Sequence, residues 1–256
     1  MASIERGRAR RVVEPKAPTV RSLDDDATRK RLIEGTLLGA LRADPPPGVQ
    51  IRTDAQLEES LSATLSAHDR TQDVHVFGYG SLMWNPAIDA AHACVARVQG
   101  WHRRFCLRML LGRGTPQAPG VMLALDRGGG CHGMLYRISA AKVETELRLL
   151  WRREMLAGSY DARWVFAQAD GRKVRTLTFV ANRQCGRYIG DRPLEDVAHL
   201  VRTGAGSLGT SRAYFDSTLQ ALHALGIRDA GIERLRRAIV RADEEAGIAR
   251  SAREQA

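Results

Sequence analysis

Cysteine, aromatic residues and long hydrophobic runs are all scarce in this chain of 256 residues, and each shortage excludes a class of protein. The four cysteines form no CxxC pair and have no histidine at zinc-ligand spacing, so we expect free thiols in a reducing compartment. Aromatic residues make up 5% of the chain, which is little for a protein that stacks nucleic-acid bases. No apolar run reaches membrane-spanning length, and the basic N-terminus lacks the apolar core of a secretory signal. We therefore predict a cytoplasmic protein; Glu5 and Glu14 weigh against a mitochondrial transit peptide.

Signatures of nucleotide, metal and serine-hydrolase chemistry are missing as well. The pair Gly78 and Gly80 lacks the third glycine of a dinucleotide fingerprint, because Met83 stands in its place. The chain has no GxxxxGKS or GxxxxGKT phosphate loop, no GxSxG elbow and no HExxH pair, and its seven histidines are scattered. We therefore expect no cofactor and no metal. Ser81 has no obvious base in the sequence, which argues against a serine hydrolase.

Positive charge exceeds negative charge, because 39 lysine and arginine residues face 29 acidic ones, a net charge of +10. This balance fits an anionic partner, such as nucleic acid, a membrane surface or an acidic metabolite, or it serves only solubility. Because the basic residues are dispersed, we favour a solubilising surface and expect neither a nucleic-acid nor a membrane partner. A monomer is favoured, although the sequence leaves the oligomeric state open.

The N-terminal part of the chain differs from the rest in composition. Residues 1–22 are basic and aperiodic and are predicted to be disordered. Asp24 to Asp26 offers N-cap chemistry for a helix over about 27–42, whose apolar face would contain Leu32, Leu37, Leu38 and Leu41. A weaker helix is predicted over 54–67. Residues 23–72 thus form a helical N-terminal extension, residues 73–246 the main domain, and residues 247–256 a polar tail.

The main domain begins with strands and ends with helices. Strands are predicted over 74–77, 97–108, 121–125 and 133–138, the last two joined by a glycine-rich hairpin loop over 126–130. Ser139 can cap a helix that runs to about 156. Asp170-Gly171 predicts a hairpin between strands over 164–169 and 174–180. Helices follow over 192–202, 211–225 and 231–246, with Gly226 at a C′ position. This order predicts an α+β fold with a largely antiparallel sheet or small barrel.

Glu154 stands out as a candidate catalytic residue. If the helix turns by about 100° per residue from Val143, the apolar stripe contains Leu147, Leu150 and Trp151, and Glu154 falls at about 20°, near its centre. Glu144 and Glu146 point away from that stripe. A buried carboxyl group has a raised pKa, as a general base working near neutral pH requires. Two alternatives remain: the helix ends near Arg153 and Glu154 turns outward, or Glu154 forms a core ion pair with an arginine.

Two glycine-rich segments are candidate binding loops. In Val76-Phe77-Gly78-Tyr79-Gly80-Ser81-Leu82, a strand runs into a turn whose backbone N–H groups can hold a carboxylate or another small anion. A tight structural turn is the alternative. The stretch 204–210 precedes a helix that contains Tyr214, and it is either an anion-binding loop or a flexible connector.

These segments together resemble the ChaC family of glutathione-specific γ-glutamylcyclotransferases. The matching stretches, in order, are VFGYGSLMW (76–84), GWHRRF (100–105), RGTP with PG (113–120), WRREMLAGSY (151–160) and GSLGTSRAY (206–214). The similarity covers about residues 73–240. It implies a γ-glutamylcyclotransferase-like fold, a mixed or antiparallel β-barrel with flanking helices. It also implies cleavage of glutathione to 5-oxoproline and Cys-Gly, with Glu154 as the essential glutamate and Tyr214 and the 76–82 loop in substrate binding. Ala157-Gly158-Ser159 departs from the family's variants after the glutamate.

The expected mechanism needs no metal, nucleotide or covalent enzyme intermediate. The substrate's own α-amine attacks its γ-amide carbonyl, and Glu154 removes the ammonium proton and then protonates the departing nitrogen. Arg103, Arg113 or Arg152 is expected to help at the pocket. Because Arg152 and Arg153 differ by about 100° on the helix, at most one of them can share the face of Glu154.

Three other functions remain as alternatives. The first is a cyclotransferase for other γ-glutamyl amines or peptides. The second is a non-catalytic binding module on the same scaffold, against which the retention of Glu154 in its motif argues. The third is a basic nucleic-acid-binding protein, which would show salt-dependent affinity.

Overall fold

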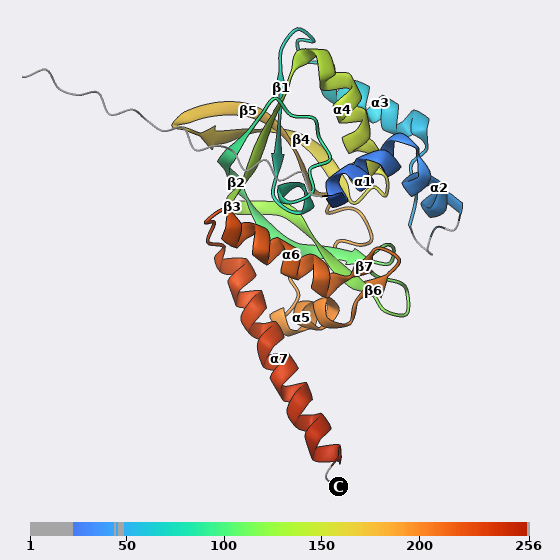
Figure 1. Ribbon diagram of the computed structural model, residues 1–256, viewed down its shortest axis with the longest axis vertical. Coiled ribbons are helices and arrows are strands. Elements are labelled where there is room, and N and C mark those ends of the chain that lie inside the picture. The colour runs from blue at the N-terminus through green and yellow to red at the C-terminus, as the bar shows by residue number, and fades with distance from the viewer. Residues whose placement is uncertain (1–22, 44, 46–48, 255–256) are drawn as a thin grey trace, which may run out of the picture.

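The centre of the protein is a closed five-stranded barrel in the strand order β1-β3-β2-β4-β5. The computed structural model describes residues 23–43, 45 and 49–254, so the predicted disordered tail over 1–22 lies outside the described residues. Helices α1 to α4 lie on one side of the barrel and α5 to α7 on the other (Figure 1). The strands are β1 (Val74–Gly78), β2 (His92–Met109), β3 (Gly120–Ile138), β4 (Tyr160–Ala169) and β5 (Arg172–Ala181). Most pairs are antiparallel, while β1 and β3 each meet β5 in parallel, so the sheet is mixed.

The predicted glycine-rich hairpin over 126–130 is wrong, because β3 runs through it without a turn. β3 pairs with β2 along almost its whole length, from Met109↔Gly120 to His92↔Arg137. The glycines form an irregularity opposite Gly100, where the register shifts between Gln99 and Trp101. Positive φ angles at Gly100, Gly128 and Gly129 let both strands bend sharply there. Each long strand can therefore contribute to two faces of the barrel, and β2 begins at His92 rather than at 97.

The hairpin between β4 and β5 is confirmed. Asp170 and Gly171 both have positive φ (48° and 73°), as a two-residue turn of the mirror-image type requires. The pairing runs in register from Ala169↔Arg172 to Tyr160↔Ala181.

The described residues of the N-terminal extension form three helices rather than two. They are α1 (Leu23–Ile33), α2 (Thr36–Ala43) and α3 (Asp54–Leu65). The single helix predicted over 27–42 is divided at Gly35, whose φ of 70° is incompatible with a continuing helix. Of the predicted apolar face, Leu32 is buried, while the side chains of Leu37, Leu38 and Leu41 lie outside the described ones. The helix predicted over 54–67 is confirmed and starts with a capping box between Thr53 and Gln56.

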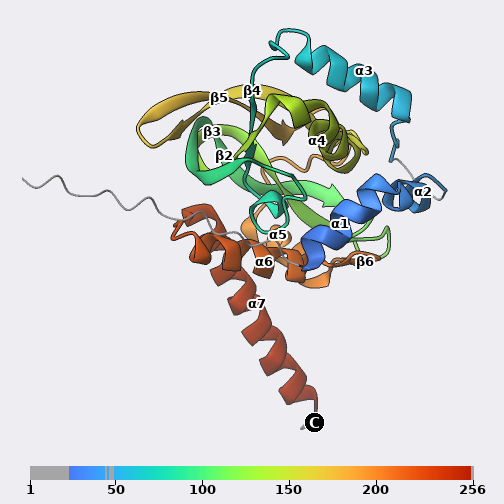
Figure 2. The same ribbon diagram turned by 45° about the horizontal axis from the view of Figure 1, so that its top comes forward.

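The helix after β3 changes its winding along its length. A 3-10 turn (Ala140–Lys142) leads into α4 (Val143–Leu150), and a π turn, η3 (Trp151–Met155), ends it. Ser139 accepts a bond from the Lys142 N–H at 2.8 Å through its carbonyl, but its side chain makes no capping bond. Glu146, which was predicted to point away from the apolar stripe, is nevertheless buried, because it pairs with Arg29 of α1. α1 lies beside α4 (Figure 2) and packs against this second face, where Leu32 clusters with Leu149.

Three helices and a small ribbon complete the molecule. α5 (Leu194–Thr203) is followed by the two-residue strands β6 (Ala205–Gly206) and β7 (Gly209–Thr210), α6 (Ser211–Ala224) and α7 (Ala230–Glu254). Gly226 has the positive φ expected at a C′ position. α7 continues as helix through part of the predicted polar tail and projects away from the barrel (Figure 1). Within the described ranges, none of the helices is both long and apolar enough to cross a bilayer.

Candidate active site

The turn after β1 depends on two glycines for different steric reasons. It continues into a short 3-10 helix, η1 (Ser81–Met83). A Cβ atom on Gly78 would lie 2.6 Å from the Leu82 Cβ, and one on Gly80 would lie 2.9 Å from the Tyr214 hydroxyl oxygen. The Tyr214 hydroxyl, which comes from α6, therefore reaches the backbone of the turn only because Gly80 has no side chain.

Tyr79 is held at both its side chain and its backbone. Its hydroxyl donates to the Phe179 carbonyl at 2.7 Å, which attaches the turn to β5. Its carbonyl accepts from the Arg103 Nε at 2.6 Å. Arg103 is itself buried and also donates to Asp229 and to the His132 carbonyl. These bonds keep the 79–82 backbone in one conformation.

Glu154 lies in the π turn, with only 13% of its side chain exposed. Its Oε1 atom lies 3.0 Å from Arg153 Nε, but that contact is not aligned as a hydrogen bond, and Oε1 is buried without a hydrogen-bond partner among the described residues. Burial raises the pKa of this carboxyl, and the Arg153 charge opposes that rise. A buried carboxylate oxygen with no donor aimed at it is costly unless something else binds there, as in a substrate site.

Arg153 connects this carboxylate to the turn after β1. Besides its ion pair with Glu154, it donates to the Asn85 carbonyl at 2.6 Å and to the Ser81 hydroxyl at 2.8 Å. The two segments that the sequence singled out are thus joined by one side chain. The alternative of a core ion pair is realised, together with the raised pKa of Glu154.

Three buried tyrosines surround Glu154: Tyr79, Tyr160 and Tyr214. Burial raises the pKa of each phenol, and the charge of Glu154 raises it further. The backbone N–H of Ser81 faces the Tyr214 hydroxyl, so an N–H donor and a phenol meet at one point beside the turn. Tyr160, whose hydroxyl donates to the Leu123 carbonyl at 2.8 Å, was not singled out from the sequence. All three phenols stay neutral. Tyr79 and Tyr160 give their single O–H hydrogens to the Phe179 and Leu123 carbonyls, so Tyr214 is the one of the three that can donate a hydrogen bond to an anion.

A family model described as ChaC-like protein matches residues 74–242. The chain belongs to this family. It is 42% identical over 181 residues to a glutathione-specific gamma-glutamylcyclotransferase of Escherichia coli (strain K12), a match that covers 70% of this chain and 78% of that protein. The human glutathione-specific gamma-glutamylcyclotransferase 1 is 31% identical over 148 residues, covering 56% and 67% of the two chains. A crystal structure of a glutathione-specific γ-glutamylcyclotransferase from yeast superposes with a TM-score of 0.62 at 19% identity, covering 66% of this chain and 96% of that one. At that identity the superposition shows the shared fold.

In this ChaC-like chain, the predicted binding residues divide into two groups. Gly80, Ser81 and Tyr214 lie together beside Arg153 and Glu154. The side chains of Val76 and Phe77 are fully buried in the barrel core. Leu82 is also buried, and its carbonyl accepts from the Tyr136 hydroxyl at 2.6 Å. Any direct contribution of these three to a ligand would come through their backbone.

The arginines predicted for the pocket occupy three different environments. Arg103 supports the turn after β1 by donating to the Tyr79 carbonyl, as described above. Arg152 donates to the Leu32 carbonyl at 3.4 Å, outside the barrel, and it is Arg153 that shares the face of Glu154. Arg113 lies over the Tyr214 ring, 5.4 Å from its centroid, and donates to the Thr210 carbonyl at 3.2 Å. Burial lowers the pKa of Arg113, and no ion pair joins it to an acidic side chain within the described part of the chain.

The glycine-rich stretch before α6 is an ordered ribbon rather than a flexible connector. β6 pairs with β7, the Leu208 N–H donates to the Gly112 carbonyl at 2.7 Å, and the Ser211 hydroxyl donates to the Arg113 carbonyl at 3.0 Å. The Thr210 side chain caps α6 by accepting from the Ala213 N–H. The ribbon therefore places Arg113 beside Tyr214, and its predicted anion binding remains a prediction.

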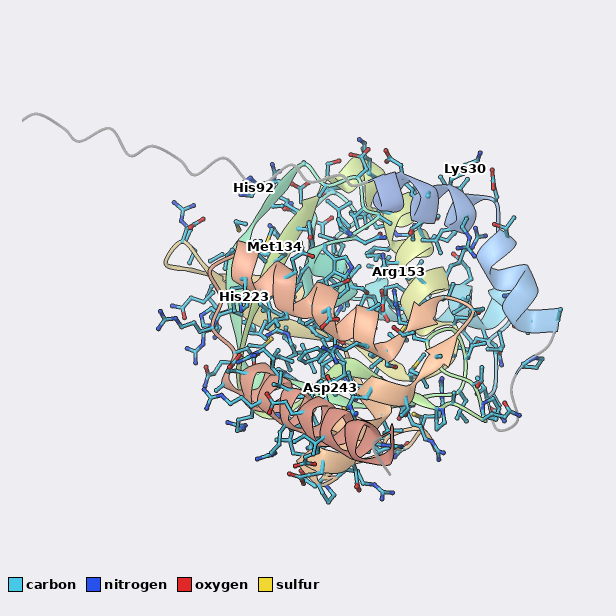
Figure 3. The ribbon with its side chains drawn as sticks, turned by 60° about the horizontal axis from the view of Figure 1, so that its bottom comes forward. Lys30, His92, Met134, Arg153, His223 and Asp243 are labelled. Carbon is cyan, nitrogen blue, oxygen red and sulfur yellow. The ribbon has the colours of Figure 1, made fainter. Side chains whose placement is uncertain are left out.

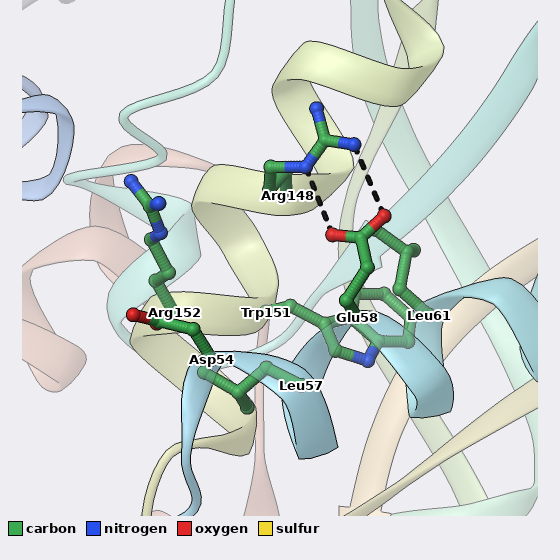
Figure 4. Close-up of a pocket in the computed structure, with 7 residues that line it drawn as sticks. All are labelled: Asp54, Leu57, Glu58, Leu61, Arg148, Trp151 and Arg152. Atoms are coloured by element: carbon green, nitrogen blue, oxygen red, sulfur yellow. Dashed lines mark hydrogen bonds and ion pairs between the residues drawn. The ribbon is translucent and has the colours of Figure 1, made fainter.

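A separate groove lies between α3 and α4, away from the carboxylate of Glu154. It is lined by Asp54, Leu57, Glu58, Leu61, Arg148, Trp151 and Arg152 (Figure 4). Among its charged residues, Arg148 pairs with Glu58 at 3.0 Å, while Asp54 pairs with Arg42, which does not line the groove. Of the predicted site residues, Arg152 lines this groove, and Glu154, Tyr214 and the 76–82 segment do not. In the described portion of the chain, no cluster of three or more His, Cys, Asp or Glu side chains is arranged to hold a metal ion.

Proposed function

We propose that this chain is a γ-glutamylcyclotransferase that converts glutathione into 5-oxoproline and cysteinylglycine. The observation that carries the proposal is the buried Glu154 carboxylate, with one oxygen lacking a hydrogen-bond donor, beside the Gly78–Ser81 turn and Tyr214. The choice of glutathione as substrate follows the E. coli and human relatives, which are both named as glutathione-specific enzymes.

The reaction is an intramolecular displacement. The α-amine nitrogen of the γ-glutamyl group attacks the γ-amide carbonyl carbon, which forms the five-membered ring. The amide C–N bond then breaks, and the nitrogen of the cysteinyl residue leaves with a proton. Because nucleophile and electrophile belong to one molecule, the enzyme gains rate by holding it in a curled conformation.

Glu154 is the proposed general base and acid. Its raised pKa suits it to accept the proton of the substrate ammonium group and to return it to the leaving nitrogen. Such proton transfer contributes about 10²–10⁴-fold to rate. Arg153 holds the carboxylate toward the turn, and its charge opposes the rise in pKa that burial causes.

The turn and Tyr214 are the proposed binding site of the γ-glutamyl portion. We assign to it the segment Val76 to Leu82 through its backbone, with the Tyr214 hydroxyl, which lies against the Ser81 N–H, as the donor to one oxygen of the α-carboxylate or of the developing oxyanion. Each such donor to an oxyanion is worth about 3–4 kcal/mol in rate. Arg113 is the proposed partner of a second substrate carboxylate, because its desolvated guanidinium has no acidic side chain beside it in the described chain.

The function is tested by incubating the purified protein with glutathione and detecting 5-oxoproline and Cys-Gly by mass spectrometry. Glu154→Gln should bind glutathione but lose turnover by about 10²-fold or more, because the amide cannot transfer the proton. Glu144→Gln is the matched control, since Glu144 lies in α4 with 69% of its side chain exposed. Wild-type rates in Glu154→Gln would refute the assignment. Parallel incubation with γ-glutamyl-alanine and ε-(γ-glutamyl)-lysine measures how far the activity extends to other γ-glutamyl amines.

We further propose that the protein acts in the cytoplasm as a monomer, without a nucleic-acid or membrane partner. Support comes from its four unpaired cysteines, Cys94, Cys106, Cys131 and Cys185. Cell fractionation and light scattering test location and oligomeric state.

A further inference from the structure

The N-terminal segment, defined here as residues 23–65, lies outside the 74–242 family match but contacts both halves of the candidate site. We propose that it is a positioning element of the active site, which holds the Glu154 turn and the stretch 85–89 in the geometry that turnover requires. The proposal rests on the proposed function. Figure 3 shows α1, on which Lys30 is labelled, at the outside of the molecule, with Arg153 toward the interior.

α1 joins the stretch after the turn to α4 through a buried ion pair. Arg29 makes two bonds of 2.6 Å to Glu146, whose side chain is 3% exposed, and donates to the Ala87 carbonyl at 2.9 Å. The Asp89 N–H donates to the same carboxylate at 2.9 Å. A buried carboxylate needs such partners, so the position of Arg29 fixes the 87–89 backbone against α4.

α1 also contacts the residue that Arg153 binds. The Asn85 side-chain amide donates to the Thr28 hydroxyl at 3.0 Å, and the Asn85 carbonyl accepts from Arg153 at 2.6 Å. Arg153 in turn contacts Glu154 and Ser81. A short series of bonds therefore leads from α1 to the carboxylate that we place at the reacting atoms.

The start of α3 holds the other end of the catalytic turn. The Arg52 N–H donates to the Leu156 carbonyl at 2.8 Å, and its guanidinium donates to the Met155 carbonyl at 3.3 Å. The last carbonyls of a helix lack partners within it, so Arg52 supplies what the end of the π turn needs. Within the turn, Trp151 donates to the Ser60 hydroxyl at 3.3 Å.

These contacts act through Glu154 and Arg153 rather than on the substrate. A displacement of a reacting group by about 1 Å can lower a rate about 10²-fold, even when the altered residue is distant. The π turn continues α4 at its N-terminal end but is followed by irregular chain from Leu156, so the position of its C-terminal end depends on bonds to other segments. The N-terminal segment makes bonds near both.

The test uses the full chain and the variants Thr28→Val, Arg29→Met and Arg52→Met, with kcat and KM for glutathione and the melting temperature measured for each. We expect kcat to fall about 3-fold to 30-fold with KM within about twofold of wild type, because the π turn that contains Glu154 moves while the proposed binding loop over 76–82 stays in place. Arg52→Lys should restore part of the loss. Lys30→Met is the matched control, since Lys30 is the neighbour of Arg29 and its side chain is 75% exposed.

The proposal is wrong if the folded variants melt at lower temperature but keep the wild-type kcat, since the segment would then serve stability alone. Should Arg29→Met fail to fold because Glu146 loses its partner, Thr28→Val decides, as it removes one hydrogen bond and preserves shape. A wild-type protein that yields no 5-oxoproline refutes the proposed function instead, so the two failures are distinguishable.

Discussion

Gly80 occupies a position where even a methyl group has no room. Its φ and ψ are both −127°, and a Cβ would lie 2.9 Å from the Tyr214 hydroxyl oxygen. Gly80→Ala should therefore push Tyr214 away from the turn, at a cost of about 1–3 kcal/mol in stability, and lower kcat by about 10²-fold. Denaturant unfolding and steady-state assays check both effects. Gly186→Ala, where a Cβ meets no atom within 4 Å, should stay at wild-type values.

The pH dependence of turnover follows from the raised pKa of Glu154. A general base must be ionised, so kcat/KM, which reports the groups of the free enzyme, falls as pH drops through that pKa, and the acid limb lies above the range of an ordinary glutamate. The Arg153 charge lowers this pKa, so Arg153→Met should move the limb to higher pH, whereas Arg152→Met should leave its midpoint in place. A limb that does not move in Arg153→Met would contradict the role of Glu154.

Arg113 is expected to bind the carboxylate at the far end of the substrate. The glycyl ethyl ester of glutathione removes that charge, and we expect wild-type kcat/KM to be about 10–100-fold lower on the ester, the value of a charge-assisted hydrogen bond. Arg113→Met should lose a similar factor on glutathione and no longer distinguish acid from ester. Arg172→Met is the control, because Arg172 is exposed at the start of β5. An equal loss on both substrates would assign Arg113 to the α-carboxylate instead.

At the scale of elements, two glycine-containing turns show what local sequence can predict. Asp170-Gly171 is a hairpin turn whose chemistry is entirely local, and it was predicted correctly. The run 126–130 has a similar composition but is a bend in β3, because its partner is the distant strand β2. Turn propensity depends only on a residue and its neighbours in sequence. Whether a glycine-rich run forms a hairpin turn or a bend within a strand is decided by the distant strand with which it pairs.

The helix that contains Glu154 shows the same division. The apolar periodicity correctly predicted that Val143, Leu147 and Leu150 lie on the buried face of the helix. It could not predict that α1 would cover Glu146, or that a π turn would bring Arg153 rather than Arg152 to Glu154. The motif around Glu154 identified the carboxylate, and only the fold identified the cation and Tyr160 beside it.

The β4–β5 turn offers a test in which stability changes and activity does not. Gly171→Ala forces a side chain into the left-handed region and should cost about 1–2 kcal/mol. Because the hairpin turn is at one end of β4 and the π turn that contains Glu154 precedes the other end, kcat should stay unchanged. Urea denaturation measures the first and a 5-oxoproline assay the second. Asp170→Asn should be nearly neutral, since asparagine tolerates positive φ. A loss of kcat in folded Gly171→Ala would show that the turn is coupled to the site.

At the scale of the whole molecule, arginine serves as an internal connector as well as a source of charge. Arg29, Arg103 and Arg187 each join segments far apart in the chain, Arg187 by donating to the Ala157 carbonyl and the Ser159 hydroxyl. The planar guanidinium suits this use, because it presents several donors at fixed angles. Part of the arginine excess in the composition therefore has a structural use inside the fold.

The root of α7 is connected to the turn after β1. Asp229 accepts from the Gly231 and Ile232 N–H groups at the start of α7, and it also pairs with Arg103, which holds the Tyr79 carbonyl. α7 projects away from the barrel, and its first turn is linked through the Arg103 side chain to the turn after β1. A force applied to the C-terminal end of α7, as in an optical trap, would therefore be transmitted through Asp229 and Arg103 to the turn after β1, and we expect the rate of turnover to change with it.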